Sequence, residues 1–169
     1  MIISLLIGAA LQAATLPEPL RPASEGKLQC YTPNVQKKTC ASLASYRLSV
    51  DGGIDNSAQV GIPGAPFVMK SVTSVRMEDG KLCGSTSRKD IEDSTITRDD
   101  RPASPAEQAE FKAILIQATA PIHGRTICTL LKPDAGGFVA QAWVDGQRVE
   151  AWDQKMIWVS LEDGYEVAL

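Results

Sequence analysis

Residues 104–124 read SPAEQAEFKAILIQATAPIHG and carry the clearest local signal in the chain. Ser104 offers an N-cap, Pro105 suits the first helical position and Glu107 completes a capping box. Pro121, close to the end of the stretch, cannot continue the helix. Between these signals, apolar residues at three- and four-residue intervals form one stripe, made of Phe111, Ile114, Leu115 and Ala118. Because such a stripe has to be covered, we expect this helix to pack on a sheet.

Segments on both sides of the helix have the alternation or the valine-rich composition of β-strands. Asp79-Gly80 and Asp145-Gly146 are strong hairpin signals between such segments. The strands are expected over residues 43–50, 56–62, 67–77, 81–83, 126–131, 138–144, 147–152 and 156–161. The predicted fold class is α+β: a single domain, mainly antiparallel β-sheet packed against one principal α-helix and stapled by two disulfides.

Residues 1–14 are expected to be a signal peptide. They contain no charged side chain, and their apolar run is shorter than a membrane-spanning helix. The small residues Ala13 and Ala14 suit cleavage by a signal peptidase. The absence of Lys or Arg before the run is atypical of a signal peptide. The alternative is a buried N-terminal helix, and the prolines at 17, 19 and 22 argue against it.

The rest of the chain is expected to have two parts. The proline-containing residues 15–27 predict a flexible leader, and residues 28–169 predict the single α+β domain. No later segment has the length of apolar residues that spans a bilayer, so we expect no membrane span after signal cleavage. A lipid anchor would need a cysteine directly after the apolar run, and the first cysteine is Cys30.

The four cysteines predict disulfides and therefore an oxidising compartment, periplasmic or extracellular. Their spacing contains no CxxC and accompanies a single histidine, which fits neither a thioredoxin-like site nor a structural zinc site. Four buried free thiols are the alternative. Three connectivities are possible, and proximity in sequence favours Cys30 with Cys40, leaving Cys83 with Cys128.

Charge argues against nucleic acid as a partner. The net charge is −3, and acidic and basic residues alternate along the chain without a clustered excess of Lys and Arg. No Gly-rich phosphate loop or metal-ligand cluster is present in the sequence, so no cofactor or metal is expected. The oligomeric state does not follow from the sequence.

His123 is the single candidate for catalysis. It follows the predicted helix end, where an imidazole commonly caps free carbonyls, and no G-x-S-x-G motif accompanies it. Carboxylates cluster at positions 90, 92, 93, 99 and 100, but without the spacing of a calcium loop and with basic residues among them. We interpret this cluster as a solvated, partly self-neutralised loop.

Three tryptophans, Trp143, Trp152 and Trp158, fall in the last predicted hairpin and strand. Alternation places Trp143 and Trp158 opposite the aliphatic residues beside them, which suggests an exposed platform for a glycan or a protein of the envelope. The first hypothesis is therefore an exported, non-enzymatic binding or interaction module. The alternative is a small secreted hydrolase that uses His123.

Overall fold

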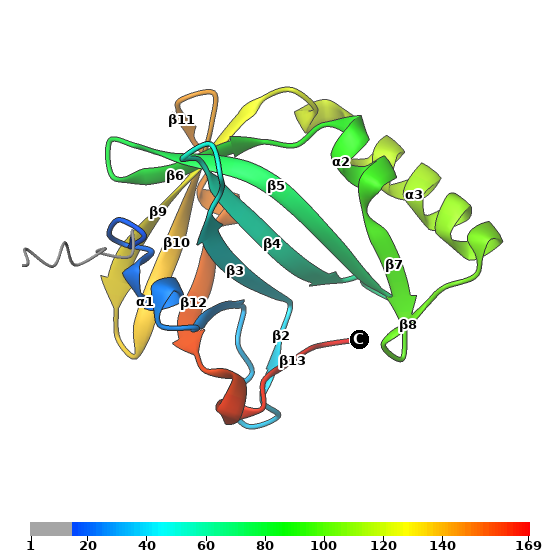
Figure 1. The fold of residues 1–169 in the computed structure, drawn as a ribbon, viewed down its shortest axis with the longest axis horizontal. Coiled ribbons are helices and arrows are strands. Elements are labelled where there is room, and N and C mark those ends of the chain that lie inside the picture. Colours follow the sequence, from blue (N-terminus) through cyan, green and yellow to red (C-terminus); the bar gives the residue numbers. More distant parts are fainter. Residues whose placement is uncertain (1–14) are drawn as a thin grey trace, which may run out of the picture.

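The computed structural model describes residues 15–169, and the predicted signal peptide lies outside the described residues. Its main feature is a closed barrel of eight antiparallel strands, closed where β4 pairs with β5 (Figure 1). In order around the barrel, the strands are β4 (Ile54–Gly61), β3 (Ser42–Leu48), β1 (Leu28–Tyr31), β12 (Gln154–Val159), β10 (Gly137–Val144), β9 (Thr126–Asp134), β6 (Lys81–Ser85) and β5 (Val68–Glu78).

Tight hairpins set the register of neighbouring strands. Asp79 and Gly80 both have positive φ, 48° and 74°, and join β5 to β6. Asp145 and Gly146 have φ values of 48° and 78° and join β10 to the short strand β11 (Gln147–Arg148). This left-handed pair of residues matches the twist of the flanking strands. Both hairpins are therefore where the Asp-Gly pairs predict them.

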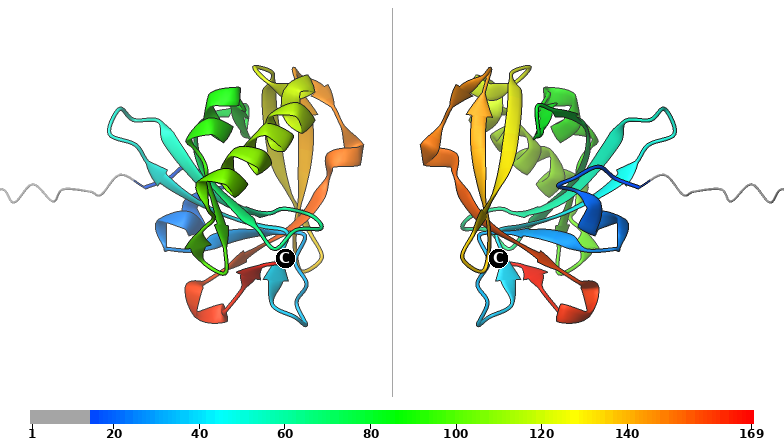
Figure 2. Two further views of the ribbon diagram at one scale, coloured as in Figure 1. Left: turned by 90° about the vertical axis from the view of Figure 1, so that its right-hand side faces the viewer. Right: turned by 90° about the vertical axis from the view of Figure 1, so that its left-hand side faces the viewer.

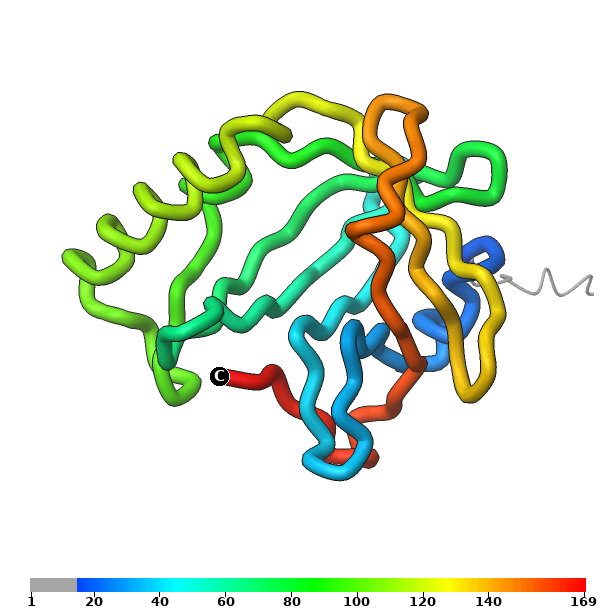
Figure 3. Tube along the Cα trace, turned by 180° about the vertical axis from the view of Figure 1, so that it is seen from behind, coloured from blue at the N-terminus to red at the C-terminus, as the bar shows by residue number. Residues whose placement is uncertain are grey.

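A long excursion leaves the barrel after β6 and returns at β9, its neighbour in the sheet (Figure 3). It contains α2 (Arg88–Asp93), β7 (Thr95–Arg98), β8 (Arg101–Pro102), α3 (Pro105–Thr119) and the 3₁₀ turn η1 (Ala120–Ile122). The helix α3 begins as the sequence predicts, because Ser104 and Glu107 form a reciprocal capping box.

The predicted α+β fold, with a sheet packed against one principal helix, is wrong. The helix α3 lies to one side of the barrel (Figure 2) and packs Phe111 and Leu115 on a small cluster around Phe67 and Ile96. None of its residues is buried, and Ile114 is 53% exposed. The physical reason is closure: buried apolar side chains of the barrel strands pack inside the barrel or in the outer cluster around Cys30 and Cys40, and little apolar sheet is left for α3 to cover.

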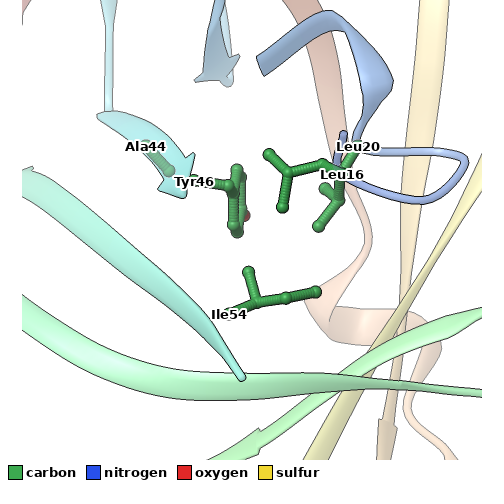
Figure 4. Packing of buried hydrophobic residues seen from close by; sticks show 5 residues of the cluster. All are labelled: Leu16, Leu20, Ala44, Tyr46 and Ile54. Carbon is green, nitrogen blue, oxygen red and sulfur yellow. The ribbon is translucent and has the colours of Figure 1, made fainter. Parts of the chain in front are cut away.

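The stretch expected to be a flexible leader contributes to the barrel interior. Leu16 and Leu20 are 5% and 0% exposed, and they pack with Tyr46 and Ile54 in one cluster (Figure 4). Leu20 immediately precedes the short helix α1 (Arg21–Ser24), and the Leu16 amide donates to Ser24 Oγ. Residues 16–24 therefore form an N-terminal plug against the interior.

The two predicted disulfides are confirmed. Cys30 and Cys40 have Cα atoms 5.4 Å apart and lie in a cluster outside the barrel with Leu43 and Val159. Cys83 and Cys128 stand directly opposite each other on β6 and β9, with Cα atoms 4.0 Å apart. One bridge therefore fixes an outer layer, and the other clamps the base of the excursion.

The remaining elements are short. They are β2 (Thr39–Cys40), which pairs in parallel with β13 (Glu166–Val167), and the 3₁₀ turns η2 (Glu150–Trp152) and η3 (Leu161–Asp163). Among the described residues, no helix combines the length and the apolar character that crossing a membrane requires.

Candidate functional site

Two adjoining cavities of about 170 and 340 Å³ lie in the barrel, and small and polar side chains form part of their lining. Both cavities are lined by Tyr31, Ile127 and Thr129. Together their walls draw on all eight barrel strands, so we treat them as two lobes of one lumen with Tyr31 between them.

The first lobe, of about 170 Å³, has a mixed wall. Its apolar side is formed by aliphatic residues of β5, β6 and β9, namely Val75, Leu82 and Ile127. Its polar side is formed by residues from six strands and the turn after β6: Tyr31, Tyr46, Asn56, Thr73, Ser85, Thr86 and Thr129. Among these described lining residues, none carries a formal charge.

The second lobe, of about 340 Å³, lies on the side of β10 and β12. Ala140 and Ala142 point into it because they alternate with outward residues on β10. Trp152 and Asp153 stand at its rim on and after η2. The Asp153 carboxylate accepts from the Ala142 amide and from Arg148, and the Arg148 guanidinium holds the pKa of Asp153 below its usual range.

Gln29 lies behind the polar wall of the first lobe and holds its two phenols. Its side chain is 0% exposed, and its Oε1 accepts from the Tyr31 hydroxyl at 2.6 Å and from the Tyr46 hydroxyl at 2.7 Å. Gln29 and Tyr31 are two apart on β1 and share the inward face. Two phenols thus share one amide oxygen, and this fixes the orientation of the Gln29 amide.

Two buried polar atoms beside this cluster have no hydrogen-bond partner among the described residues. They are Gln29 Nε2, a donor, and Asn56 Oδ1, an acceptor. Asn56 lies directly opposite Tyr46 in the β3–β4 register, so both atoms belong to one wall formed by β1, β3 and β4. A buried polar group without a partner costs about 1–3 kcal/mol. Of the two residues, Asn56 lines the first lobe, so its Oδ1 is an acceptor for a bound molecule, whereas Gln29 is not among the described lining residues.

Burial extends the pH range over which the two phenols stay neutral. It raises the pKa of Tyr46 well above the usual tyrosine range, and the nearby Tyr31 raises the pKa of Tyr46 further. Burial also raises the pKa of Tyr31, although its contact with Tyr46 lowers that pKa in part. Both hydroxyls therefore remain hydrogen-bond donors to Gln29 at neutral pH.

These pKa shifts predict how stability depends on alkaline pH. A raised pKa in the folded state means that unfolding favours ionisation, so the stabilisation is full below the usual tyrosine pKa of about 10 and is lost as the pH rises through the higher folded values. In a spectrophotometric titration, we expect two of the three tyrosines to ionise later than in the unfolded chain. In the Tyr46→Phe variant, one tyrosine, Tyr31, should still ionise at a higher pH than in the unfolded chain. Simultaneous ionisation of all three at the unfolded-state pH would contradict the buried cluster.

The structure separates the three tryptophans. Trp143 lies outside the barrel opposite Cys128, with Lys81 Nζ and Arg148 Cζ at 5.5 and 5.0 Å from its ring centroid. Trp152 is at the rim of the second lobe and is 41% exposed. Trp158 is partly buried and packs on the clusters of the interior. The three side chains thus share no single face, and Trp152 is the one that borders the lumen.

His123 stands at the end of η1, outside the lining of both lobes. Its Nε2 is 2.8 Å from Thr119 Oγ1, which also bonds to the Leu115 carbonyl. In the described part of the chain, this threonine is the hydrogen-bond partner found for the ring, and neither a serine nor a carboxylate joins it. The surroundings of His123 are those of a residue that finishes a helix.

The carboxylate cluster lies in the excursion and is largely paired. Glu92 and Asp93 bond to Arg88 and Lys89 one turn away on α2. Asp90 caps the same helix by accepting from Ser87. Over residues 15–169, the group whose geometry suits a metal is Glu78, Cys83 and Cys128, but its two sulfurs are bonded to each other in the disulfide.

The lumen residues were not singled out from the sequence. Gln29, Asn56 and Thr129 are polar residues in strands, and in a half-buried sheet that pattern is typical of the face towards water. A signal was nevertheless present, because Tyr46 and Ala44 alternate with polar residues on β3 and do face the interior. Closure of the barrel, which makes a polar inward face possible, has no local sequence signal.

Comparisons with models of protein families, with curated proteins and with solved structures found no match for this chain.

Proposed function

We propose that this protein is an exported, non-enzymatic binding protein that holds a small molecule inside its barrel. The observation that carries the proposal is the lumen, whose two lobes of about 170 and 340 Å³ meet at Tyr31. Eight-stranded barrels are just wide enough to be filled by side chains or to hold one small ligand. Here small side chains at inward positions, such as Ala140 and Ala142, leave space and favour the binding of a small ligand.

Export is supported by the two disulfides, which persist in oxidising compartments and are rare in a reducing cytoplasm. The expected leader over residues 1–14 is consistent with the same route. The periplasm or the extracellular space is therefore the proposed location of the folded protein.

The size of the lumen limits the ligand. A dry engineered cavity of about 150 Å³ accepts benzene, so the first lobe has room for one six-membered ring. The second lobe has room for a substituent that extends past Tyr31 towards Trp152. No comparable arrangement supports the alternative of a hydrolase. Within residues 15–169, the His123 ring bonds to a threonine, and His123 is not among the residues that line either lobe, although its backbone lies beside that of the lining residue Thr86.

Filling the lumen tests the proposal. Thr129 lines both lobes, so Thr129→Phe should block them together. The purified protein is incubated with small molecules extracted from the periplasm, passed through gel filtration and denatured, and the released compounds are identified by mass spectrometry. We expect the wild type to retain a compound that Thr129→Phe retains at least about tenfold less, because a blocked pocket loses more than one favourable contact.

Ala113→Phe is the matched control, since it adds the same ring on an exposed position of α3. It should retain the compound like the wild type. Overpacking costs about 1–3 kcal/mol, so thermal unfolding of each variant is measured first, and Thr129→Ile replaces the phenylalanine variant if that variant is unfolded. Equal retention by the wild type and the blocked variant, including no retention by either, would refute the proposal.

A further inference from the structure

The polar wall of the first lobe restricts the chemistry of the ligand. This inference rests on the proposed function and concerns the same lumen. Asn56 lines this lobe, and its Oδ1 is buried without a partner among the described residues. We infer that the ligand is a small neutral ring that carries a hydrogen-bond donor, which Asn56 accepts.

Gln29 fixes the two phenols of this wall from behind. Its Oε1 accepts from both Tyr31 and Tyr46, at 2.6 and 2.7 Å. Both phenols are protonated at neutral pH, because the usual tyrosine pKa is about 10 and burial raises it in each. Gln29 itself is not among the described residues that line either lobe, so the unpaired group that the ligand meets is Asn56.

Asn56 supplies the acceptor. It lines the lobe directly between Tyr46 on β3 and Thr73 on β5, with which it is in register. Its Oδ1 has no donor partner among the described residues, so an N–H or O–H of the ligand would satisfy it. An apolar ligand would leave Asn56 Oδ1 without a partner, at a cost of about 1–3 kcal/mol.

Charge is excluded by the surroundings. The lining that the structure describes for this lobe contains no Lys, Arg, His, Asp or Glu. A carboxylate or an ammonium group would lose its hydration there without gaining an ion partner, which is strongly unfavourable. Fatty-acid headgroups and phosphates are therefore disfavoured in the first lobe, whereas amides and hydroxyls suit it.

A series of six-membered-ring probes tests this inference by titration calorimetry. The probes are 2-piperidone, which has an amide; cyclohexanol, which has a hydroxyl; cyclohexanone, which has an acceptor alone; toluene; and cyclohexanecarboxylate. We expect the amide, the alcohol or both to bind at least about tenfold more tightly than toluene, which is the effect of one good hydrogen bond. The two donor-bearing probes distinguish an amide ligand from a hydroxyl ligand. The carboxylate should not bind.

Asn56→Leu tests whether the probes bind at the polar wall of the first lobe, because it keeps the size of the side chain and removes the acceptor. The affinity of the preferred donor-bearing probe should fall about tenfold, while that of cyclohexanone stays unchanged. Gln59→Leu makes the same change on the exposed outer face of β4 and should have no effect. If Asn56→Leu does not fold, Asn56→Val replaces it. This variant also removes the acceptor, so the donor-bearing probe should again lose affinity relative to cyclohexanone.

Several results would overturn the inference while leaving the proposed function intact. They are tightest binding of toluene, binding of the carboxylate, an unchanged probe preference in Asn56→Leu, or retention by the lumen of a compound that is apolar or charged. If no probe binds although an extracted compound is retained, Asn56 does not select the ligand, and the inference fails. Failure of both the probes and the retention experiment would refute the proposed function as well.

Discussion

Removing the Cys83–Cys128 disulfide with Cys83→Ala and Cys128→Ala should lower the free energy of unfolding by about 4 kcal/mol, because the bridge closes a loop of 45 residues in the unfolded chain. For a domain of this length, that loss corresponds to a fall in the melting temperature of roughly 10 °C. Urea denaturation and calorimetry of the double variant measure the two quantities.

The matched control is the double variant Cys30→Ala and Cys40→Ala. Its bridge spans 10 residues, and the same chain-entropy relation predicts a loss of about 3 kcal/mol. Both cysteine pairs are buried, so the comparison mainly isolates loop length. A larger loss for the short bridge would contradict the expected order and would show that packing around Cys30 dominates.

Leu20→Ala should destabilise the protein by about 2–5 kcal/mol, which is the usual cost of truncating a fully buried leucine. Leu20 is 0% exposed and lies in the N-terminal plug with Leu16, Tyr46 and Ile54. Trp158 packs against the same cluster, so the total fluorescence of the three tryptophans includes a contribution from this site. Urea denaturation followed by tryptophan fluorescence measures the change.

Leu161→Ala provides the comparison, since Leu161 is 77% exposed and its truncation should change stability by less than about 0.5 kcal/mol. If the two leucine variants unfolded at the same urea concentration, residues 16–24 would not be docked on the barrel. This result would restore the flexible leader that the prolines of this segment predict.

Local features of the fold could be predicted from the sequence because short-range chemistry determines them. The capping box of Ser104 and Glu107 and the two Asp-Gly hairpins are present as expected. Closure could not be predicted, since it depends on pairing β4 with β5 and β1 with β12, and the second pair joins segments from opposite ends of the chain. The apolar stripe of residues 111–118 therefore predicted the helix correctly, but the expectation that this helix covers the main sheet was wrong.

The face assignment of β12 shows a second limit. Both faces of this strand are apolar, with Met156 and Trp158 inside and Ile157 and Val159 outside. The outer pair is covered by the Cys30–Cys40 layer, so aliphatic residues mark the outside of the barrel here. Alternation alone separates the two faces of a strand but cannot say which one is the interior.

The candidate site was beyond sequence reasoning for a related reason. Gln29 and Asn56 come from strands that are not neighbours in the chain, and their shared wall exists only after β1, β3 and β4 have paired. Trp152 was singled out from the sequence and does border the lumen, but on a 3₁₀ turn rather than on a tryptophan platform.

The excursion between β6 and β9 is an insertion whose two ends lie side by side. Its two ends emerge from adjacent strands that already pair over Leu82–Ser85 and are joined covalently at Cys83 and Cys128. The excursion is therefore a covalently closed insertion whose contents also support the barrel, because β7 pairs with β5 and α3 covers Phe67. Its exchange for a short turn would keep the order of the barrel strands but would uncover Phe67 and the start of β5, so a grafted domain would have to cover both.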